Sequence, residues 1–276
     1  MDSTFLFLPE MILIASILAI PAIYIATEST KSYSICSNIS LFVSLLLVVL
    51  FWYYPDDVSF DKSSSSYIIY DHFVINDFSQ LFKAIFLISA LAVSVVSSSY
   101  FKEDEPHQAE YYVLLLSSAL GMLITASAND FLTIFVGIEL SAFSSYGLVA
   151  FRKTNDKSTE AGAKYLLIGA FSSALTLYGI SLLYALTGSV TFEGVNAFLT
   201  GLENGVIDGD FNELVFISSL FIIAGLGFKI AVVPFHAWAP DVYEGAPTPV
   251  TALLAAASKA MGFVALLKVF IFTLEP

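Results

Sequence analysis

Eight long apolar segments constrain the fold of this chain more than any other feature. They cover about residues 5–27, 35–54, 78–100, 110–128, 131–151, 161–186, 213–236 and 247–274. Each segment is long enough to cross a bilayer as a helix, which needs about 20 mostly apolar residues. The runs are continuous rather than alternating with period two, so they predict helices and not the strands of a barrel. We therefore predict an all-α polytopic membrane protein with about eight transmembrane helices.

Composition sets further limits on the class of protein. Charged residues make up 13% of the chain, against about 25% in a soluble domain. The net charge of -13 does not suggest a nucleic-acid partner. A single cysteine excludes an internal disulfide, and three histidines in different segments form no legible metal site. The N-terminus lacks the basic region of a secretory signal and the arginines of a transit peptide, so we expect the first helix to be retained.

Charges in the connecting loops predict the orientation. The connections after the first, third and fifth helices carry the basic residues Lys31, Lys102, Arg152, Lys153 and Lys157. Those after the second and sixth helices contain one lysine, Lys62, and many acids. These acids are Asp56, Asp57, Asp61, Asp71, Glu193, Glu203, Asp208 and Asp210. Because lysine and arginine favour the inner side of a membrane, the N-terminus is predicted on the outer side.

Three apolar segments contain a charged residue in their interior. These residues are Glu139, Lys229 and Lys259. A lysine at bilayer depth costs about 3 kcal/mol on insertion scales unless a partner or water stabilises it. Charged residues in such positions usually pair with one another and mark ion or proton paths. The sequence therefore predicts a charge-transfer path through the membrane.

Glu139 and Lys229 are the first candidates for a proton relay. Desolvation favours the neutral form of a buried lysine, and a nearby carboxylate favours the charged form. A change in the surrounding charge can therefore make such a lysine take up or release a proton. The alternative interpretation is a static ion pair that holds two helices together. Pro234 follows Lys229 and predicts a kink or break in the seventh helix, and His236 beyond it either relays protons or caps the helix end.

Other lysines lie nearer to the ends of their helices. Lys164 has Glu160 four residues before it, which is the spacing of a pair on a helix surface, and both a structural and a relay role stay open. Lys83 and Lys268 are interpreted as anchors that extend to the membrane interface. Ser172 and Ser173 could bind water along a path, although most serines in such helices bond to the preceding turn.

Three motifs in the second part of the chain resemble one known family. Residues 158–179 resemble the sixth helix of the antiporter-like chain 2 subunit of respiratory complex I, and residues 227–251 resemble its most characteristic stretch. Residues 137–141, Gly-Ile-Glu-Leu-Ser, match its fifth-helix glutamate motif. The resemblance is specific over residues 110–270, whereas residues 1–105 agree only in hydropathy.

The resemblance implies a fold and a set of roles. Residues 1–105 would form three N-terminal helices, and residues 106–276 would form one antiporter-like bundle of helices four to eight with a broken seventh helix. Glu139 would be the fifth-helix glutamate, Lys229 its partner in the broken helix and Lys259 the central lysine of the eighth helix. Lys164 would be the sixth-helix lysine.

The resemblance also implies partners and cofactors. Quinone reduction elsewhere in the complex would drive charge shifts along such groups, while this chain would bind no cofactor itself. FMN, iron–sulfur clusters and the quinone are expected in other subunits. Family members have about fourteen helices in two inverted bundles, whereas the eight helices predicted here account for one bundle. We expect that the second bundle is either carried by a second polypeptide or lost. The expected location is a mitochondrial inner membrane or a bacterial plasma membrane.

Three functions compete at this point. The first is a proton-translocating subunit of NADH:ubiquinone oxidoreductase, an enzyme only at the level of the complex. The second is a subunit of a multisubunit cation/proton antiporter or of a membrane hydrogenase, with the same relay but another driving module. The third is a structural membrane scaffold. The chain retains the charged residues Glu139, Lys164, Lys229 and Lys259. Their retention argues against the scaffold, because a subunit that had lost proton transfer should first lose the charges that are costly to bury.

Overall fold

A computed structural model describes residues 3–27, 30–53, 67–69, 72–102, 105–206 and 211–271. Within these ranges, eight helical segments are long and apolar enough to cross a membrane, as predicted. The first seven spans are formed by α1 (Leu8–Thr27, preceded by the short η1, Ser3–Phe7), α2 (Thr30–Tyr53), α3 (Asp77–Tyr100), α4 (Gln108–Ser127), α5 (Phe131–Val149), α6 (Asp156–Thr187) and α8 (Asn212–Ile230). The eighth combines α10 (Thr248–Leu253), η2 (Leu254–Ser258) and α11 (Lys259–Val269).

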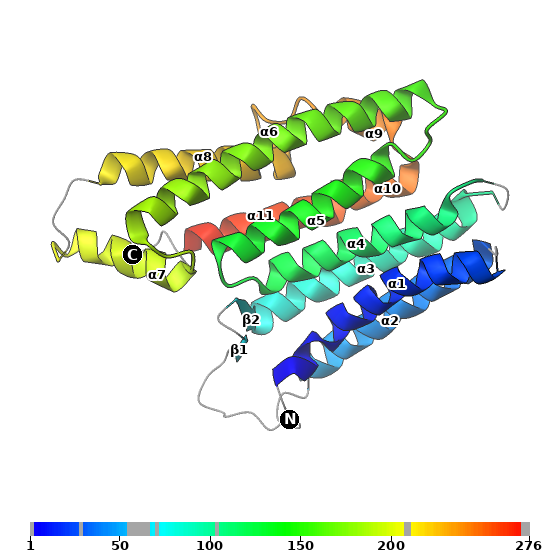
Figure 1. Ribbon diagram of the computed structural model, residues 1–276, viewed down its shortest axis with the longest axis horizontal. Helices are drawn as coiled ribbons and strands as arrows, with labels where there is room; N and C mark the ends of the chain where they lie inside the picture. Colours follow the sequence, from blue (N-terminus) through cyan, green and yellow to red (C-terminus); the bar gives the residue numbers. More distant parts are fainter. Residues whose placement is uncertain are drawn as a thin grey trace.

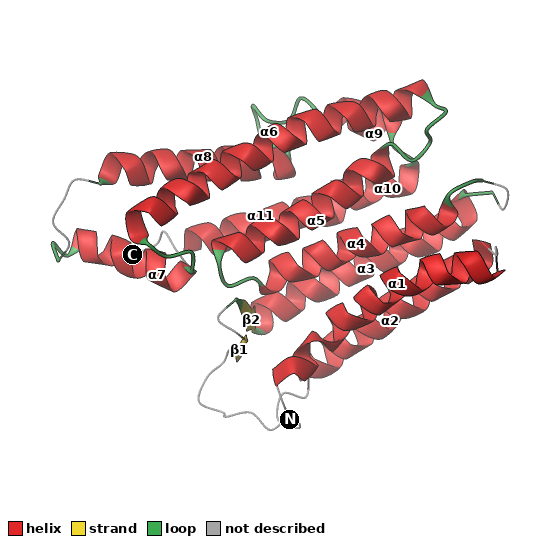
Figure 2. Ribbon diagram, in the orientation of Figure 1, coloured by secondary structure: helices red, strands yellow, loops and turns green. Residues whose placement is uncertain are grey.

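The spans run roughly parallel and antiparallel to one another in a single elongated bundle (Figure 1). Helices α1 to α4 pack together, α4 pairs with α5, and α6 pairs with α8. The last span connects these groups because α10 packs against α3 and α11 packs against both α4 and α8. Loops gather at the two ends of the bundle (Figure 2). We call the end at which α1, α3 and α5 begin the N-terminal face.

The α4–α5 hairpin is as tight as the two-residue Asn129-Asp130 turn predicts. Asp130 caps α5, because its carboxylate accepts a hydrogen bond of 2.8 Å from the Thr133 amide. The two helices touch at their glycines: a Cβ on Gly121 would lie 2.6 Å from the Gly137 carbonyl oxygen. The small residues at this crossing allow the backbones of α4 and α5 to approach each other closely.

The two long connections, which the sequence analysis treated as loops, contain short elements. After the sixth span lies the amphipathic helix α7 (Phe192–Glu203), which Thr191 caps through the Gly194 amide. Between the second and third spans, β1 (Tyr67–Ile69) pairs antiparallel with β2 (Phe73–Ile75). The loop residues Asp56, Asp57, Asp61, Lys62, Asp71, Asp208 and Asp210 lie outside the described residues.

The seventh span breaks, as predicted, but earlier than the proline. Helix α8 ends at Ile230, and Ala231 takes the left-handed conformation with φ of 55°. The Val232 amide then bonds to the Gly227 carbonyl and the Ala231 amide to that of Phe228, which is the pattern of a Schellman motif. The chain turns through Pro234, and a short helix, α9 (Ala239–Gly245), follows the break.

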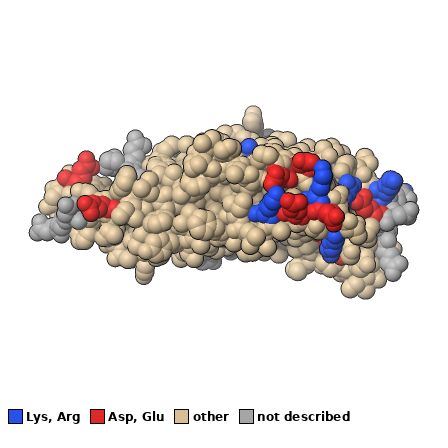
Figure 3. Space-filling view, turned by 90° about the horizontal axis from the view of Figure 1, so that it is seen from above, with Lys and Arg blue, Asp and Glu red and all other residues tan. Residues whose placement is uncertain are grey.

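The outside of the bundle is largely apolar. Many large hydrophobic side chains are exposed, including Leu18, Leu167 and Phe171. The face in Figure 3 has a broad uncharged middle, with acidic groups at one end and a dense mixture of both charges at the other. A bare apolar middle between charged ends is the surface expected of a bundle that spans a membrane.

Candidate functional site

Glu139 lies on α5 and is partly buried against α6. The Ser173 hydroxyl donates a hydrogen bond of 2.5 Å to the Glu139 carboxylate, and it also lies 3.1 Å from the Gly169 carbonyl oxygen. A donor at this position stabilises the ionised carboxylate in an apolar setting. The serine therefore bonds to the preceding turn of its own helix, which was one of the two predicted roles, and also to the acid, which the sequence did not predict.

Lys229 lies on the last turn of α8 and is only 5% exposed. Among the described residues, no hydrogen-bond partner reaches its Nζ atom. The adjoining break is packed firmly, since Trp238 donates a hydrogen bond to the Phe228 carbonyl and stacks on Tyr165 at 4.8 Å. A buried amine without a fixed partner, at the end of a broken helix, can change its charge in response to its surroundings.

One small cavity brings Glu139 and Lys229 together. Its volume is about 10 Å³, roughly the space that one water molecule needs. Besides these two residues, its lining includes Tyr146, Ser173 and Thr176. The structure thus places the predicted acid and lysine around a common space, and no direct ion pair between them is recorded among the described residues.

Glycines allow the helices around this cavity to approach one another. A Cβ on Gly169 would lie 2.0 Å from the Tyr146 hydroxyl oxygen, and a Cβ on Gly225 would lie 1.9 Å from the Thr176 hydroxyl oxygen. Ser172 adds an interhelical hydrogen bond of 2.7 Å to the Gly225 carbonyl. The observed packing around the cavity therefore requires glycine at these two positions.

Lys259 lies on the next element, directly after the π-helical turn η2. Its Nζ atom is 5.5 Å from the centre of the Tyr243 ring on α9, which is a cation–π distance. One turn further along α11, Gly262 faces α8, and a Cβ there would lie 3.1 Å from the Lys229 Cβ. The end of α8 that carries Lys229 therefore packs against α11 one turn from Lys259. Short π-helical turns are frequent at functional sites.

Lys164 lies outside this cavity, on the α6–α9 surface. It pairs with Glu160 at 2.7 Å, as the i,i+4 spacing predicts, and with Asp241 of α9 at 2.5 Å. A second pair, Lys157 with Glu244 at 2.5 Å, links the same two helices. These residues line an open cleft of about 170 Å³.

His236 is exposed in the turn between α8 and α9 and does not line the cavity. Its carbonyl oxygen accepts a hydrogen bond of 3.0 Å from the Ala239 amide, at the start of α9. Among the described contacts, His236 therefore caps the start of α9 through its main chain and not through its imidazole.

Two of the sequence interpretations were wrong. Lys83 and Lys268 do not extend to the interface, because they are 0% and 2% exposed. Lys83 forms an ion pair of 2.7 Å with Glu10, and Lys268 donates a hydrogen bond of 2.6 Å to the Ala128 carbonyl. Sequence reasoning also missed Tyr146 as a cavity residue. The signal for Glu10 was present, since it is an acid inside the first apolar segment.

Comparison with known proteins decides the family. The family model described as "NADH:quinone oxidoreductase/Mrp antiporter, TM" matches residues 128–275. This stretch contains the cavity and the three helices that line it, α5, α6 and α8, together with the break after α8, and it is more than half of the 276 residues. The chain belongs to this antiporter-like family.

Two relatives show how far the family similarity extends. NADH-quinone oxidoreductase subunit N of Desulfitobacterium hafniense is 46% identical over 196 residues, which cover 71% of this chain and 38% of the relative. F(420)H(2) dehydrogenase subunit N of Methanosarcina mazei is 36% identical over 269 residues, covering 96% of this chain and 52% of the relative. The similarity therefore reaches into the first 105 residues, for which we predicted agreement only in hydropathy.

A solved structure shares the fold. A chain of "Respiratory complex I from Thermus thermophilus with bound Aureothin" superposes with a TM-score of 0.76 at 28% identity, covering 95% of this chain and 53% of that chain. Across the three proteins, this chain spans 38–53% of the length of the protein that it matches. The antiporter-like membrane fold is thus shown for this chain, which corresponds to about half of such a protein.

Proposed function

We propose that this chain is a proton-translocating membrane-arm subunit of an NADH:quinone oxidoreductase, respiratory complex I. The observation that carries the proposal is the cavity that Glu139 and Lys229 share. A carboxylate held by a serine hydroxyl and a buried amine without a fixed partner form a pair whose proton can move. The enzyme activity belongs to the complex, and this chain contributes proton movement rather than redox chemistry.

The remaining predicted residues extend the proposed path on both sides. Lys259 continues it beyond Lys229, where α11 packs against the end of α8. Lys164 and its carboxylate partners provide a charged, open surface at the other end of α6. His236 lies at the exposed turn between α8 and α9. In this proposal, charge shifts driven by quinone reduction elsewhere change the protonation of Glu139 and Lys229 in turn.

The proposed partners follow from the subunit's place in such a complex. Other membrane-arm subunits cover part of the apolar surface. The chain matches about half of the length of its relatives, and in the proposed complex the second antiporter-like bundle is supplied on this polypeptide or on another. FMN, iron–sulfur clusters and quinone are assigned to other subunits. A bacterial relative supports a bacterial plasma membrane over a mitochondrial inner membrane, with the N-terminal face on the outer side.

A second candidate function has its own support. The matching family includes Mrp antiporters, and one relative is named for F(420)H(2) rather than NADH. The chain could therefore serve a cation/proton antiporter, a membrane hydrogenase or a related dehydrogenase with the same relay. A scaffold without proton movement is the third candidate, and the retained Glu139 and Lys229 argue against it.

An inventory of the native complex tests the assignment. The membrane is solubilised gently, complexes are separated on a native gel stained for NADH oxidation, and the band holding this chain is analysed by mass spectrometry. NADH-oxidising subunits together with sequence for a second bundle, whether on this polypeptide or on another, are the expected result. A band without any redox subunit would refute the complex I assignment and favour the ion exchanger.

A further inference from the structure

A second set of buried titratable groups lies away from the Glu139–Lys229 cavity. Glu10 of α1 and Lys83 of α3 form an ion pair of 2.7 Å, and their side chains are only 6% and 1% exposed. The Glu10 Oε2 atom is also buried and has no hydrogen-bond partner among the described residues. A buried carboxylate with an unsatisfied oxygen is costly to maintain. The pair therefore calls for a role beyond packing.

Lys268 of α11 extends this set toward the N-terminal face. It is buried and lies within coulombic range of Lys83, so a second amine lies near the amine of the Glu10–Lys83 pair. Its Nζ atom donates a hydrogen bond of 2.6 Å to the Ala128 carbonyl, in the turn between α4 and α5. Because the two amines interact, the protonation of Lys268 is coupled to that of Lys83 and, through the ion pair, to that of Glu10.

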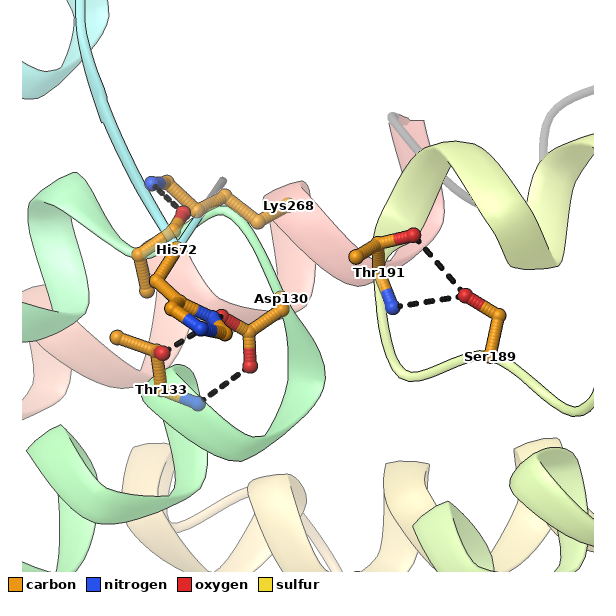
Figure 4. Close-up of polar contacts among 7 residues, drawn as sticks. His72, Asp130, Thr133, Ser189, Thr191 and Lys268 are labelled. Atoms are coloured by element: carbon orange, nitrogen blue, oxygen red, sulfur yellow. Dashed lines mark hydrogen bonds and ion pairs between the residues drawn. The ribbon is translucent and has the colours of Figure 1, made fainter. Parts of the chain in front are cut away.

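The same turn connects the buried groups to the surface. Asp130 lies two residues after Ala128 and is fully buried, and its carboxylate lies 3.0 Å from the Nδ1 atom of His72. The His72 side chain is 56% exposed. The Asn129 amide bonds to the His72 carbonyl at 2.8 Å, which fixes the two segments against each other. Figure 4 shows His72 against Asp130, with Lys268 reaching the same turn from α11.

We propose that Glu10, Lys83 and Lys268 form a second proton-exchange site, which communicates with water at the N-terminal face through the Asp130–His72 pair. In each exchange, a proton leaves the nitrogen or oxygen of one group as it binds to the next, so the number of protons is unchanged. His72 is the group that takes a proton from water or gives it back. An imidazole suits this step because one of its ring nitrogens can accept a proton while the other donates one.

The competing explanation is a structural clamp. An ion pair between α1 and α3 could simply hold the N-terminal helices together. The two explanations differ in one testable respect. A clamp needs the charges or an apolar replacement of similar volume, whereas a proton site needs an amine that can lose its proton. Arginine keeps the positive charge and the pairing but does not release its proton at neutral pH.

Two variants of the intact complex in sealed membrane vesicles separate the explanations. Lys83→Arg keeps the ion pair without the exchangeable proton, and the double variant Glu10→Leu/Lys83→Met replaces the pair by apolar groups. The readout is protons translocated per electron pair, normalised to assembled complex. Lys153→Arg, at an exposed lysine, is the matched control. We expect the number of protons translocated per electron pair to fall at least twofold in both test variants and to stay unchanged in the control.

Normal translocation in whichever of the two variants assembles would overturn the proposal and leave a clamp. Lys268→Arg, expected to fall at least twofold as well, decides the question if neither assembles. His72→Gln tests the surface connection, and normal translocation in that variant would overturn the proposed route to water.

This inference rests on the proposed function, because it requires a chain that moves protons. The two can fail separately. If Glu139→Gln and Lys229→Ala also translocate normally, the proposed function fails. If these two are impaired while Lys83→Arg and the double variant are normal, only the second exchange site fails.

Discussion

Gly225→Ala is the substitution for which the structure gives the clearest geometric expectation. A Cβ at this position would lie 1.9 Å from the Thr176 hydroxyl oxygen and 2.8 Å from the Ser172 carbonyl oxygen. The hydroxyl can rotate away, but the carbonyl belongs to the backbone of α6. Relief of the second contact therefore requires α6 and α8 to separate. Overpacking of this kind destabilises a protein by about 1–3 kcal/mol.

The separation would act directly on the proposed site. Gly225 lies one turn before Lys229 on α8, and Ser172 is next to Ser173, which holds Glu139. Moving α8 away from α6 enlarges the shared cavity and loses the Ser172 hydrogen bond to the Gly225 carbonyl. We therefore expect a fall in proton translocation together with a lower thermal midpoint, by roughly 2–10 °C from the overpacking energy.

The assay is thermal unfolding in one detergent at fixed lipid, combined with proton translocation in vesicles. Gly147→Ala is the matched control, because its added Cβ would meet only the flexible Leu114 side chain, at 2.9 Å. The same chemical change is thus made against backbone in one case and against a movable methyl group in the other. Equal midpoints for the Gly225 and Gly147 variants would refute the claim that α6–α8 packing sets the site.

Three further substitutions test individual contacts. Ser173→Ala removes a hydrogen bond to a charged group, worth about 1.5–3 kcal/mol, so vesicle assays should show reduced proton translocation that Ser173→Thr restores. His236→Ala should reduce translocation less than Lys229→Ala does, because the imidazole is exposed and outside the cavity; an equal loss would contradict this placement. Lys164→Met removes the cation that pairs with two acids, so limited proteolysis should cut near α9 faster; an unchanged rate would show that the pairs do not hold α9.

Segment length and hydropathy were sufficient to predict the spans. A run of about 20 apolar residues has few alternatives in a membrane, so all eight predicted spans correspond to helices. The break in the seventh span was predicted from Pro234, but the helix ends at Ile230 because a Schellman motif closes it first. That motif requires Ala231 in a left-handed conformation. Glycine usually takes this conformation and alanine rarely does, so the sequence did not predict the motif.

Two residues of the candidate site were recognisable in the sequence, but their arrangement was not. Glu139 and Lys229 were identifiable because a charge in an apolar run is conspicuous and costly. Their shared cavity depends on close contacts between α6 and α8, which no local pattern specifies. The Glu10–Lys83 pair was missed for the same reason: each residue lies near a helix end, where an exposed position is the ordinary expectation, and only packing of α1 against its neighbours buries both.

The measurement that tests the central claim most directly is the number of protons translocated per NADH oxidised by the assembled complex carrying Glu139→Gln. Glutamine has nearly the same shape and can still accept the Ser173 hydrogen bond, so the cavity should persist while the exchangeable carboxyl proton is lost. Our account predicts a clear fall in this ratio, with the variant assembled in normal amounts. An unchanged ratio would contradict the assignment of Glu139 and its cavity to proton transfer.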